Sequence, residues 1–262
     1  MSPAAALNQT TESKDRIIVA LDVATTGEAV SIVDELKGSV GAFKVGLQLF
    51  TAAGPDFVRK LVDSGARVFL DLKFHDIPNT VAKASVEAAR LGIWMFNVHA
   101  VGGREMMTRT VEEVAEACER VSLERPKIIA VTVLTSSDNA TLAETGVTGE
   151  SEPQVLRLAA LTAECGLDGI VASPLEIEPV RARIASNKFL VVTPGIRPAS
   201  ATKDDQKRVM TPVEALSAGA DHVVIGRPIT GAANRLQAVE DIITGIGGVT
   251  SEFSPPPDSN VL

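Results

Sequence analysis

The chain has 262 residues, of which 45% are hydrophobic and 22% are charged, and its formal net charge is −8. Such a composition is typical of a globular protein with a large apolar core. The negative charge argues against a nucleic-acid partner, because no basic stripe is present to neutralise phosphates. No apolar run approaches the ~18 residues of a membrane span, so we expect no membrane association.

Compartment and domain organisation follow from the cysteines and the termini. Cys118 and Cys165 lie far apart in segments predicted to be helical, which favours free thiols in a reducing compartment. Residues 1–14 are polar and lack the apolar core of a signal peptide, so we expect a cytoplasmic protein. Residues 1–14 and the Ser/Pro-rich residues 251–262 are predicted to be disordered tails around one domain, residues 15–250.

Short β-branched runs alternate with amphipathic segments along this domain. The predicted strands are Ile17–Asp22, Ala42–Gly46, Arg67–Phe74, Met95–Ala100, Ile128–Thr135, Gly169–Ala172, Phe189–Thr193 and His222–Ile225. A plausible helix follows each one, and eight such units at this length predict a closed parallel (β/α)8 barrel. A doubly wound open sheet is the alternative, but no Gly-x-Gly-x-x-Gly follows the first strand, which weakens its dinucleotide-binding form.

Helix boundaries and two long connections fit this pattern. Thr26 precedes the first amphipathic segment, and Gly38 is expected just beyond its end. Residues 211–214, Thr-Pro-Val-Glu, form a capping box, and Gly219 should end that helix. The polar connections 136–152 and 194–210 are too long for turns, so we predict that both cover a ligand.

The most informative stretch is residues 68–80, an apolar run that places Asp71, Lys73, His75 and Asp76 within six positions. Alternate side chains of a strand share a face, so Asp71 and Lys73 should point the same way. A buried strand that becomes charged at its C-terminal end is typical of a catalytic position in a barrel. The alternative is a strand running into a solvated loop, which the apolar neighbours on both sides disfavour.

Two other strand ends add charge to this set. Asp22 ends the first predicted strand, and Lys44 lies in the second between apolar residues, where a charge is costly to bury unless its stem snorkels to solvent. With Asp71, Lys73 and Asp76 they form an alternating set of acids and bases. Such a set stays ionised out of water only if its members pair with one another.

A phosphate site is predicted at the last two strands, where barrels commonly bind phosphate through backbone N–H groups near glycine and a cation. The candidates are Gly195, Arg197, Gln206, Gly226 and Arg227. The histidines are interpreted as structural: His75 alternates to the face opposite Lys73 and should pack behind the site, and His222 is an ordinary polar residue. His99 could form hydrogen bonds behind the site, and no Cys/His spacing suggests zinc.

Residues 71–80, Asp-Leu-Lys-Phe-His-Asp-Ile-Pro-Asn-Thr, resemble the signature of the orotidine 5′-monophosphate decarboxylase family. Further matches fall in the family's order and cover nearly the whole barrel: Ala20-Leu-Asp22, Phe43-Lys-Val-Gly46, Val98-His-Ala100, Val131-Thr-Val-Leu-Thr135, Thr193-Pro-Gly-Ile-Arg-Pro198, Asp205-Gln206 and Ile225-Gly-Arg-Pro228.

The resemblance implies a (β/α)8 homodimer that converts orotidine monophosphate to uridine monophosphate and CO2, the last step of pyrimidine synthesis, without metal or organic cofactor. It implies that Lys73 is the proton donor to C6, beside Asp71 and Lys44. Asp76 and Thr80 would reach the partner's site. Asp22 and Lys44 would bind the ribose hydroxyls, Thr135 the pyrimidine, and Gln206, Gly226, Arg227 and Arg197 the phosphate.

Two alternatives stay open. A magnesium-dependent sugar-phosphate decarboxylase or aldolase of the same superfamily would carry an acid where this chain has Lys44, and a cation there repels Mg²⁺. A non-catalytic barrel that binds a sugar phosphate would need no charge set around Lys73.

Overall fold

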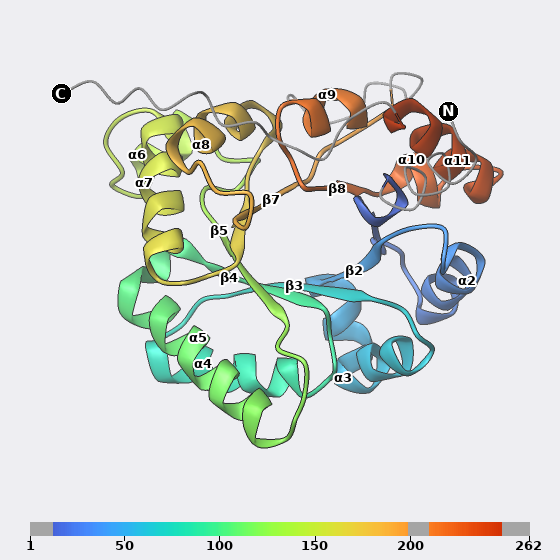
Figure 1. The fold of residues 1–262 in the computed structure, drawn as a ribbon, viewed down its shortest axis with the longest axis horizontal. Helices are drawn as coiled ribbons and strands as arrows, with labels where there is room; N and C mark the ends of the chain where they lie inside the picture. Colours follow the sequence, from blue (N-terminus) through green and yellow to red (C-terminus); the bar gives the residue numbers. More distant parts are fainter. Residues whose placement is uncertain (1–12, 199–209, 248–262) are drawn as a thin grey trace.

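The computed structural model describes residues 13–198 and 210–247. Eight parallel strands form a closed barrel in which each strand pairs with its neighbour in sequence and β8 pairs with β1 (Figure 1). The predicted (β/α)8 barrel is therefore confirmed. The predicted tails lie outside the described residues apart from Ser13 and Lys14.

The strands agree closely with the sequence-based boundaries. They are β1 (Ile17–Ala20), β2 (Ala42–Gly46), β3 (Val68–Phe74), β4 (Met95–His99), β5 (Lys127–Val131), β6 (Gly169–Val171), β7 (Leu190–Thr193) and β8 (His222–Ile225). The largest error is β5, which was predicted to reach Thr135. The neighbouring β6 ends at Val171, opposite Val131, so the following residues have no strand to pair with, and the hydroxyl of Thr132 instead donates to the Val171 carbonyl at 3.2 Å.

Helices surround the barrel. They are α2 (Thr26–Leu36), α3 (Leu47–Asp63), α4 (Pro78–Ala89), α5 (Gly103–Arg120), α6 (Asn139–Glu144), α7 (Ser151–Glu164), α8 (Ile177–Arg183), α9 (Pro212–Ser217), α10 (Arg227–Thr230) and α11 (Arg235–Ile246).

Most of the predicted helix signals hold. The cap of α2 is Thr25, one residue before the expected Thr26, because Thr25 has an extended backbone and accepts from the N–H of Glu28. The capping box at Thr211 is present, and Gly38 and Gly219 have positive φ at the expected helix ends. The connection 136–152 is not wholly irregular, since it contains α6 and the start of α7.

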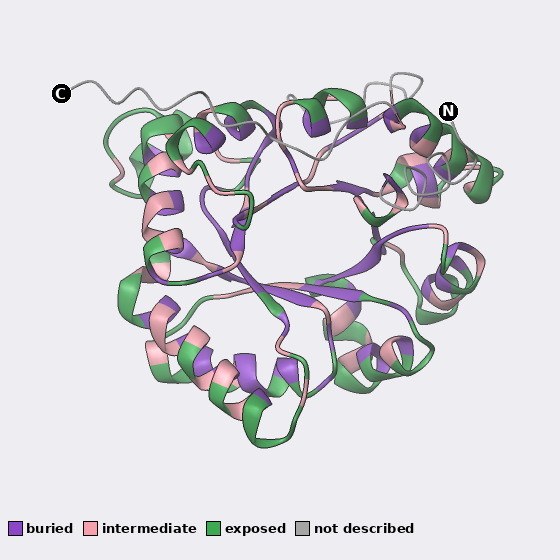
Figure 2. Cartoon of the chain, in the orientation of Figure 1, coloured by how far each residue is buried: buried purple, intermediate pink, exposed green. Residues whose placement is uncertain are grey.

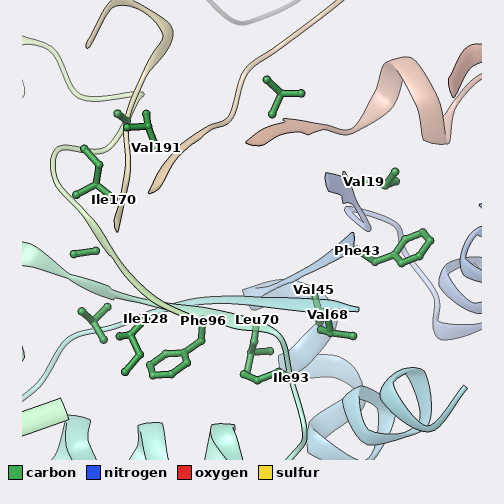
Figure 3. Close-up of a cluster of buried hydrophobic side chains, with 14 of the residues drawn as sticks. Val19, Phe43, Val45, Val68, Leu70, Ile93, Phe96, Ile128, Ile170 and Val191 are labelled. Atoms are coloured by element: carbon green, nitrogen blue, oxygen red, sulfur yellow. The ribbon is translucent and has the colours of Figure 1, made fainter. Parts of the chain in front are cut away.

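Apolar side chains form two layers on either side of the sheet. Outward-facing residues such as Val19, Phe43, Leu70, Phe96 and Ile170 pack between strands and helices (Figures 2 and 3). A smaller cluster fills the barrel interior: Ile18, Ala20, Ala42, Phe69, Met95, Ile129, Val192 and Val224. Interior positions closer to the C-terminal strand ends are where polar side chains replace apolar ones.

The N-terminal mouth of the barrel is closed by an aromatic contact. The rings of Trp94 and His222 meet edge to face at a centroid distance of 5.2 Å, and the Arg67 guanidinium lies 4.4 Å from the Trp94 ring centroid. Burial, with the charges of Arg67 and Arg16, lowers the pKa of His222 to about 4, against a hydrogen bond with the Asp15 backbone. His222 is therefore a neutral packing residue near neutral pH rather than a merely polar strand start.

The cysteines and the helix lengths are two further features of the described part of the chain. Cys118 and Cys165 are both buried free thiols, as predicted. None of the helices in residues 13–198 and 210–247 is long and apolar enough to cross a membrane.

Candidate active site

A cavity of about 490 Å³ opens at the C-terminal ends of the strands. Its volume is in the range that holds a small-molecule ligand. Its lining includes most of the predicted site residues: Asp22, Lys44, Asp71, Lys73, Thr135, Arg197, Gly226 and Arg227. The barrel thus brings together side chains that are up to about 200 positions apart in the sequence, as its C-terminal face is built to do.

Four charged side chains alternate across one wall of this cavity. The Lys44 ammonium lies 3.2 Å from Oδ1 of Asp22 and 3.3 Å from Oδ2 of Asp71. The Lys73 ammonium lies 2.6 Å from Oδ1 of Asp71. Each charge therefore has an opposite charge beside it, which is the pairing expected for a set held partly out of water.

Asp71 is the centre of the set. Its side chain is 13% exposed, whereas that of Lys73 is 36% exposed and reaches toward the open cavity. Burial raises the pKa of Asp71, but the ammonium groups of Lys44 and Lys73 and hydrogen bonds from Lys73 and Asn97 outweigh it and hold the pKa below its usual value. Asp71 is thus a fixed carboxylate that orients two ammonium groups.

The backbone at Lys73 departs from a regular strand. Its φ is +53°, in the left-handed region, and the pairing of β3 with β4 shifts register between Leu70 and Phe74. Lys73 therefore faces the cavity on the same side as Asp71, as alternation predicts, but from an irregular backbone. Such a conformation is costly for a residue with a side chain and tends to occur at functional sites.

Sequence reasoning missed Asn97, a residue of β4 that is 1% exposed. Its Oδ1 accepts from the backbone N–H of Lys73 at 2.7 Å, and its Nδ2 donates to Oδ1 of Asp71 at 2.7 Å. The available signal was a single amide inside an apolar strand, two residues before the strand end. An amide within a strand has many structural explanations, so this signal alone does not identify a site residue.

Two predicted site residues in the described ranges, Asp76 and Thr80, do not line the cavity of this chain. Asp76 and Thr80 are exposed and lie just before and within the first turn of α4, next to Ile77, which is 66% exposed. Gln206 lies outside the described residues. Asp76 and Thr80 therefore lie on the surface of this chain, shortly after the C-terminal end of β3.

The opposite side of the cavity is formed by the segments after β7 and β8. Gly195 has a φ of +79°, a conformation that favours glycine. The backbone N–H of Arg197 donates to the carbonyl of Met210 at 3.1 Å, which joins the two ends of the connection after β7. Gly226 and Arg227 come directly after β8, at the start of α10. This side combines glycine backbone with two guanidinium groups, a chemistry suited to an anion.

The two histidines near the site stay outside the cavity lining. His75 is exposed rather than packed behind the site, and its ring centroid lies 5.5 Å from that of His99. Burial lowers the pKa of His99, the neighbouring His75 and Lys73 lower it further, and the carboxylate of Asp71 opposes this shift. His99 is thus a neutral neighbour of the charge set near neutral pH.

The carboxylates of the cavity are poorly suited to a divalent cation, since Asp22 and Asp71 are both paired with Lys44. In the described residues, no three His, Cys, Asp or Glu side chains are grouped so as to hold a metal ion. The donor set therefore fits an anionic organic ligand, with ammonium groups at one side and guanidinium groups at the other.

Comparisons with known proteins agree with this geometry. A family model described as "Orotidine 5′-phosphate decarboxylase / HUMPS family" matches residues 15–242. A Geotalea daltonii protein named orotidine 5′-phosphate decarboxylase is 52% identical over 235 residues, covering 90% of this chain and 97% of that protein. A Syntrophotalea carbinolica protein of the same name is 49% identical over 241 residues, covering 92% and 98%.

Solved structures show the same likeness. The crystal structure of orotidine 5′-phosphate decarboxylase from Lactobacillus acidophilus is 38% identical, has a TM-score of 0.78, and covers 88% of this chain and 98% of that one. The enzyme of the same name from Pyrococcus horikoshii is 26% identical with a TM-score of 0.71, covering 89% and 100%.

Proposed function

The chain belongs to the orotidine 5′-phosphate decarboxylase / HUMPS family, and from this membership we infer that it is a carboxy-lyase acting on orotidine 5′-monophosphate. It converts this nucleotide to uridine 5′-monophosphate and CO2, the last step of pyrimidine synthesis. The observation that carries the inference is the Asp22–Lys44–Asp71–Lys73 chain of ion pairs, facing a glycine- and arginine-rich wall across one cavity.

The chemistry follows from where charge develops. The bond from C6 to the carboxylate carbon breaks, CO2 leaves, and its bonding electrons stay on C6, which the pyrimidine ring delocalises poorly. The Lys73 ammonium stabilises this charge and donates a proton to C6, and solvent then reprotonates the amine. Asp71 holds Lys73 in place, and Lys44 holds Asp71 in turn.

The remaining polar residues bind the parts of the nucleotide that do not react. Asp22 and Lys44 bind ribose hydroxyls, and Thr135 contacts the pyrimidine. Gln206, Gly226, Arg227 and Arg197 bind the phosphate. The phosphate lies far from C6, and the free energy of its binding helps to hold the reacting carbon in the correct orientation.

The working unit in this proposal is a cytoplasmic homodimer without metal or organic cofactor. Asp76 and Thr80 are exposed shortly after the C-terminal end of β3, and each completes the site of the partner chain. Ile77, between them, is 66% exposed, and a large apolar side chain there would be covered in a dimer. The chain's own ammonium groups supply the positive charge that a metal ion would otherwise provide.

The direct test is to mix the protein with orotidine monophosphate and EDTA and to follow the loss of orotate absorbance. We expect rapid loss in wild type, none in Lys73→Ala, and normal turnover in Lys83→Ala, a control that removes a lysine ion-paired to Glu113 on the protein surface. Uridine monophosphate, the product of the proposed reaction, should still bind Lys73→Ala. Arg227→Ala should instead raise KM, by about 10²-fold for the loss of a charged phosphate contact.

Two results would contradict the proposal. A Lys73→Ala protein that turns over normally would remove Lys73 as proton donor. A flat wild-type trace that recovers only with magnesium and a sugar phosphate would assign the chain to the metal-dependent branch.

A further inference from the structure

We propose that Asn97 is a positioning residue for the decarboxylation, holding the backbone of Lys73 and the carboxylate of Asp71 in one fixed arrangement. This inference rests on the proposed function and deepens it, since it adds a residue to the machinery that places the proton donor. Asn97 does not line the cavity and acts only through its two neighbours.

The contacts of Asn97 leave one orientation for its amide. The Lys73 N–H is only a donor, so it requires the amide oxygen, and the Asp71 carboxylate is only an acceptor, so it requires the amide nitrogen. Both contacts are 2.7 Å long, and the side chain is almost fully buried. The two hydrogen bonds therefore hold the amide in one orientation. Together they connect β4 to Asp71 and Lys73, two successive interior-facing residues of β3.

Lys73 needs such a tie because of its backbone. The ladder between β3 and β4 pairs Leu70 with Phe96 and Phe74 with Val98, and the register shifts between these two pairs, in the stretch that contains Lys73 with its positive φ. Its N–H bonds to the Asn97 side chain where a regular strand would use a backbone carbonyl. A left-handed non-glycine residue persists only where its surroundings hold it, and the Asn97 oxygen is the partner that does so here.

The Asn97 side chain is uncharged, and this property is as important for holding Asp71 and Lys73 as its shape. The groups that face this cluster are Asp22 and Lys44 from the first two strands, Asp71 and Lys73 from β3, and His99 farther along β4. The positive charges are already matched to the carboxylates around them. Aspartate at position 97 would keep the acceptor for Lys73 but place a second carboxylate against Asp71 and remove the donor.

The experiment compares Asn97→Ala and Asn97→Asp with Met95→Val, a control that removes packing atoms from the next interior-facing position of the same strand. In both Asn97 variants kcat should fall by about 10²-fold, as for a reacting group misplaced by ~1 Å, while KM changes by less than about 3-fold because the phosphate wall is intact. Met95→Val should lower the melting temperature and leave kcat within about 3-fold of wild type.

The pH dependence of kcat distinguishes a positioning role of Asn97 from a general loss of core packing. In Asn97→Asp the paired carboxylates should move the acid limb of kcat upward by about one pH unit or more. In Met95→Val the acid limb should not move. If Met95→Val reproduces the kcat loss and the pH shift, or if both Asn97 variants keep wild-type kcat, the proposal is wrong.

Amide hydrogen exchange gives a readout that does not depend on turnover. The Lys73 amide should be protected in wild type and in Asn97→Asp, and exchange faster in Asn97→Ala, which lacks the acceptor. Equal protection in all three proteins would overturn the tie between Asn97 and Lys73. A wild-type protein that does not decarboxylate the nucleotide would instead overturn the proposed function, and the exchange result would still decide the tie.

Discussion

The residue proposed as the proton donor also has an unfavourable backbone conformation within its strand. Lys73 has a φ of +53°, and Ser122 is the other non-glycine residue in the described ranges with positive φ. Ser122 follows α5 in a turn, where a left-handed residue is common, whereas Lys73 lies within β3. The conformation turns the Lys73 side chain beside Asp71, so the backbone cost accompanies the ion pair that orients the ammonium.

This cost should be measurable by comparing Lys73→Gly with Lys73→Ala. Both variants lose the ion pair and the proton donor, but glycine adopts positive φ without a steric penalty. We expect the glycine variant to have a free energy of unfolding about 1 kcal/mol higher, after allowing for the extra freedom of glycine in the unfolded chain. Urea unfolding followed by circular dichroism measures the difference.

Ser122→Gly and Ser122→Ala form the matched control for this comparison, because Ser122 has the same φ and its side chain carries no charge. The same order of stabilities is expected there. An alanine variant at position 73 that is as stable as the glycine variant would show that the left-handed backbone disappears with the lysine side chain.

Most of the site could be predicted from single residues because their types are unusual where they occur. A lysine in the apolar run of β2 and an Asp-x-Lys at the end of β3 have few structural explanations, so Lys44, Asp71 and Lys73 were found from the sequence. Asn97 was not found, because one amide in a strand has many explanations. Only the fold shows that it faces Asp71 and the N–H of Lys73.

At the scale of elements, strand propensity located all eight strands but not all of their ends. Residues 132–135 have the composition of a strand, yet β5 stops at Val131 because β6 offers no further pairing partner. The irregularity in β3 was missed for a related reason, since register is set by two strands together and cannot be read from one. Helix caps were easier to predict than strand ends, because a capping box such as that at Thr211 is a local sequence signal.

The start of β8 gives a prediction about acid stability. His222 has a pKa of about 4 in the folded protein against an ordinary value of 6.5. As the pH falls below 6.5 the unfolded chain takes up the proton first, so the free energy of unfolding decreases by about 1.4 kcal/mol per pH unit until the folded pKa is reached. In His222→Asn the loss between pH 7 and pH 5 should be smaller by about 2 kcal/mol.

Urea unfolding at the two pH values measures this difference. Ser31→Asn is the control, because it places an asparagine at an exposed position, removes no titratable group and should keep the wild-type dependence. Identical pH dependence in wild type and His222→Asn would show that His222 is not held neutral by the fold.

At the scale of the whole molecule, the two ends of the barrel have different tasks. The N-terminal mouth is closed by aromatic packing, and the C-terminal mouth holds the charge set and the cavity. Asp76 and Thr80 are the exception, since they lie shortly after the C-terminal end of β3 but do not line the cavity of their own chain. In the proposed dimer each chain would lend them to the other, so the complete site would belong to the pair.

Subunit mixing tests this arrangement. Lys73→Ala and Asp76→Asn should each be inactive alone, yet a mixture exchanged in mild denaturant should recover about one quarter of the wild-type sites, because each mixed dimer has one intact site. Mixing Lys73→Ala with Asp71→Asn, two residues from the same wall, should recover no activity. Recovery in neither mixture would show that Asp76 serves its own chain.

The aromatic contact at the closed end of the barrel also determines which changes in this protein can be followed by its tryptophan fluorescence. The chain has one tryptophan and no tyrosine, so its ultraviolet emission comes from Trp94, whose indole touches His222 and Arg67 at the mouth opposite the cavity. Nucleotide binding should leave that emission unchanged, whereas protonation of His222 or unfolding should alter it at once. The same scarcity of chromophores gives the protein little absorbance of its own, so the spectrum of a bound or reacting pyrimidine can be recorded almost without background.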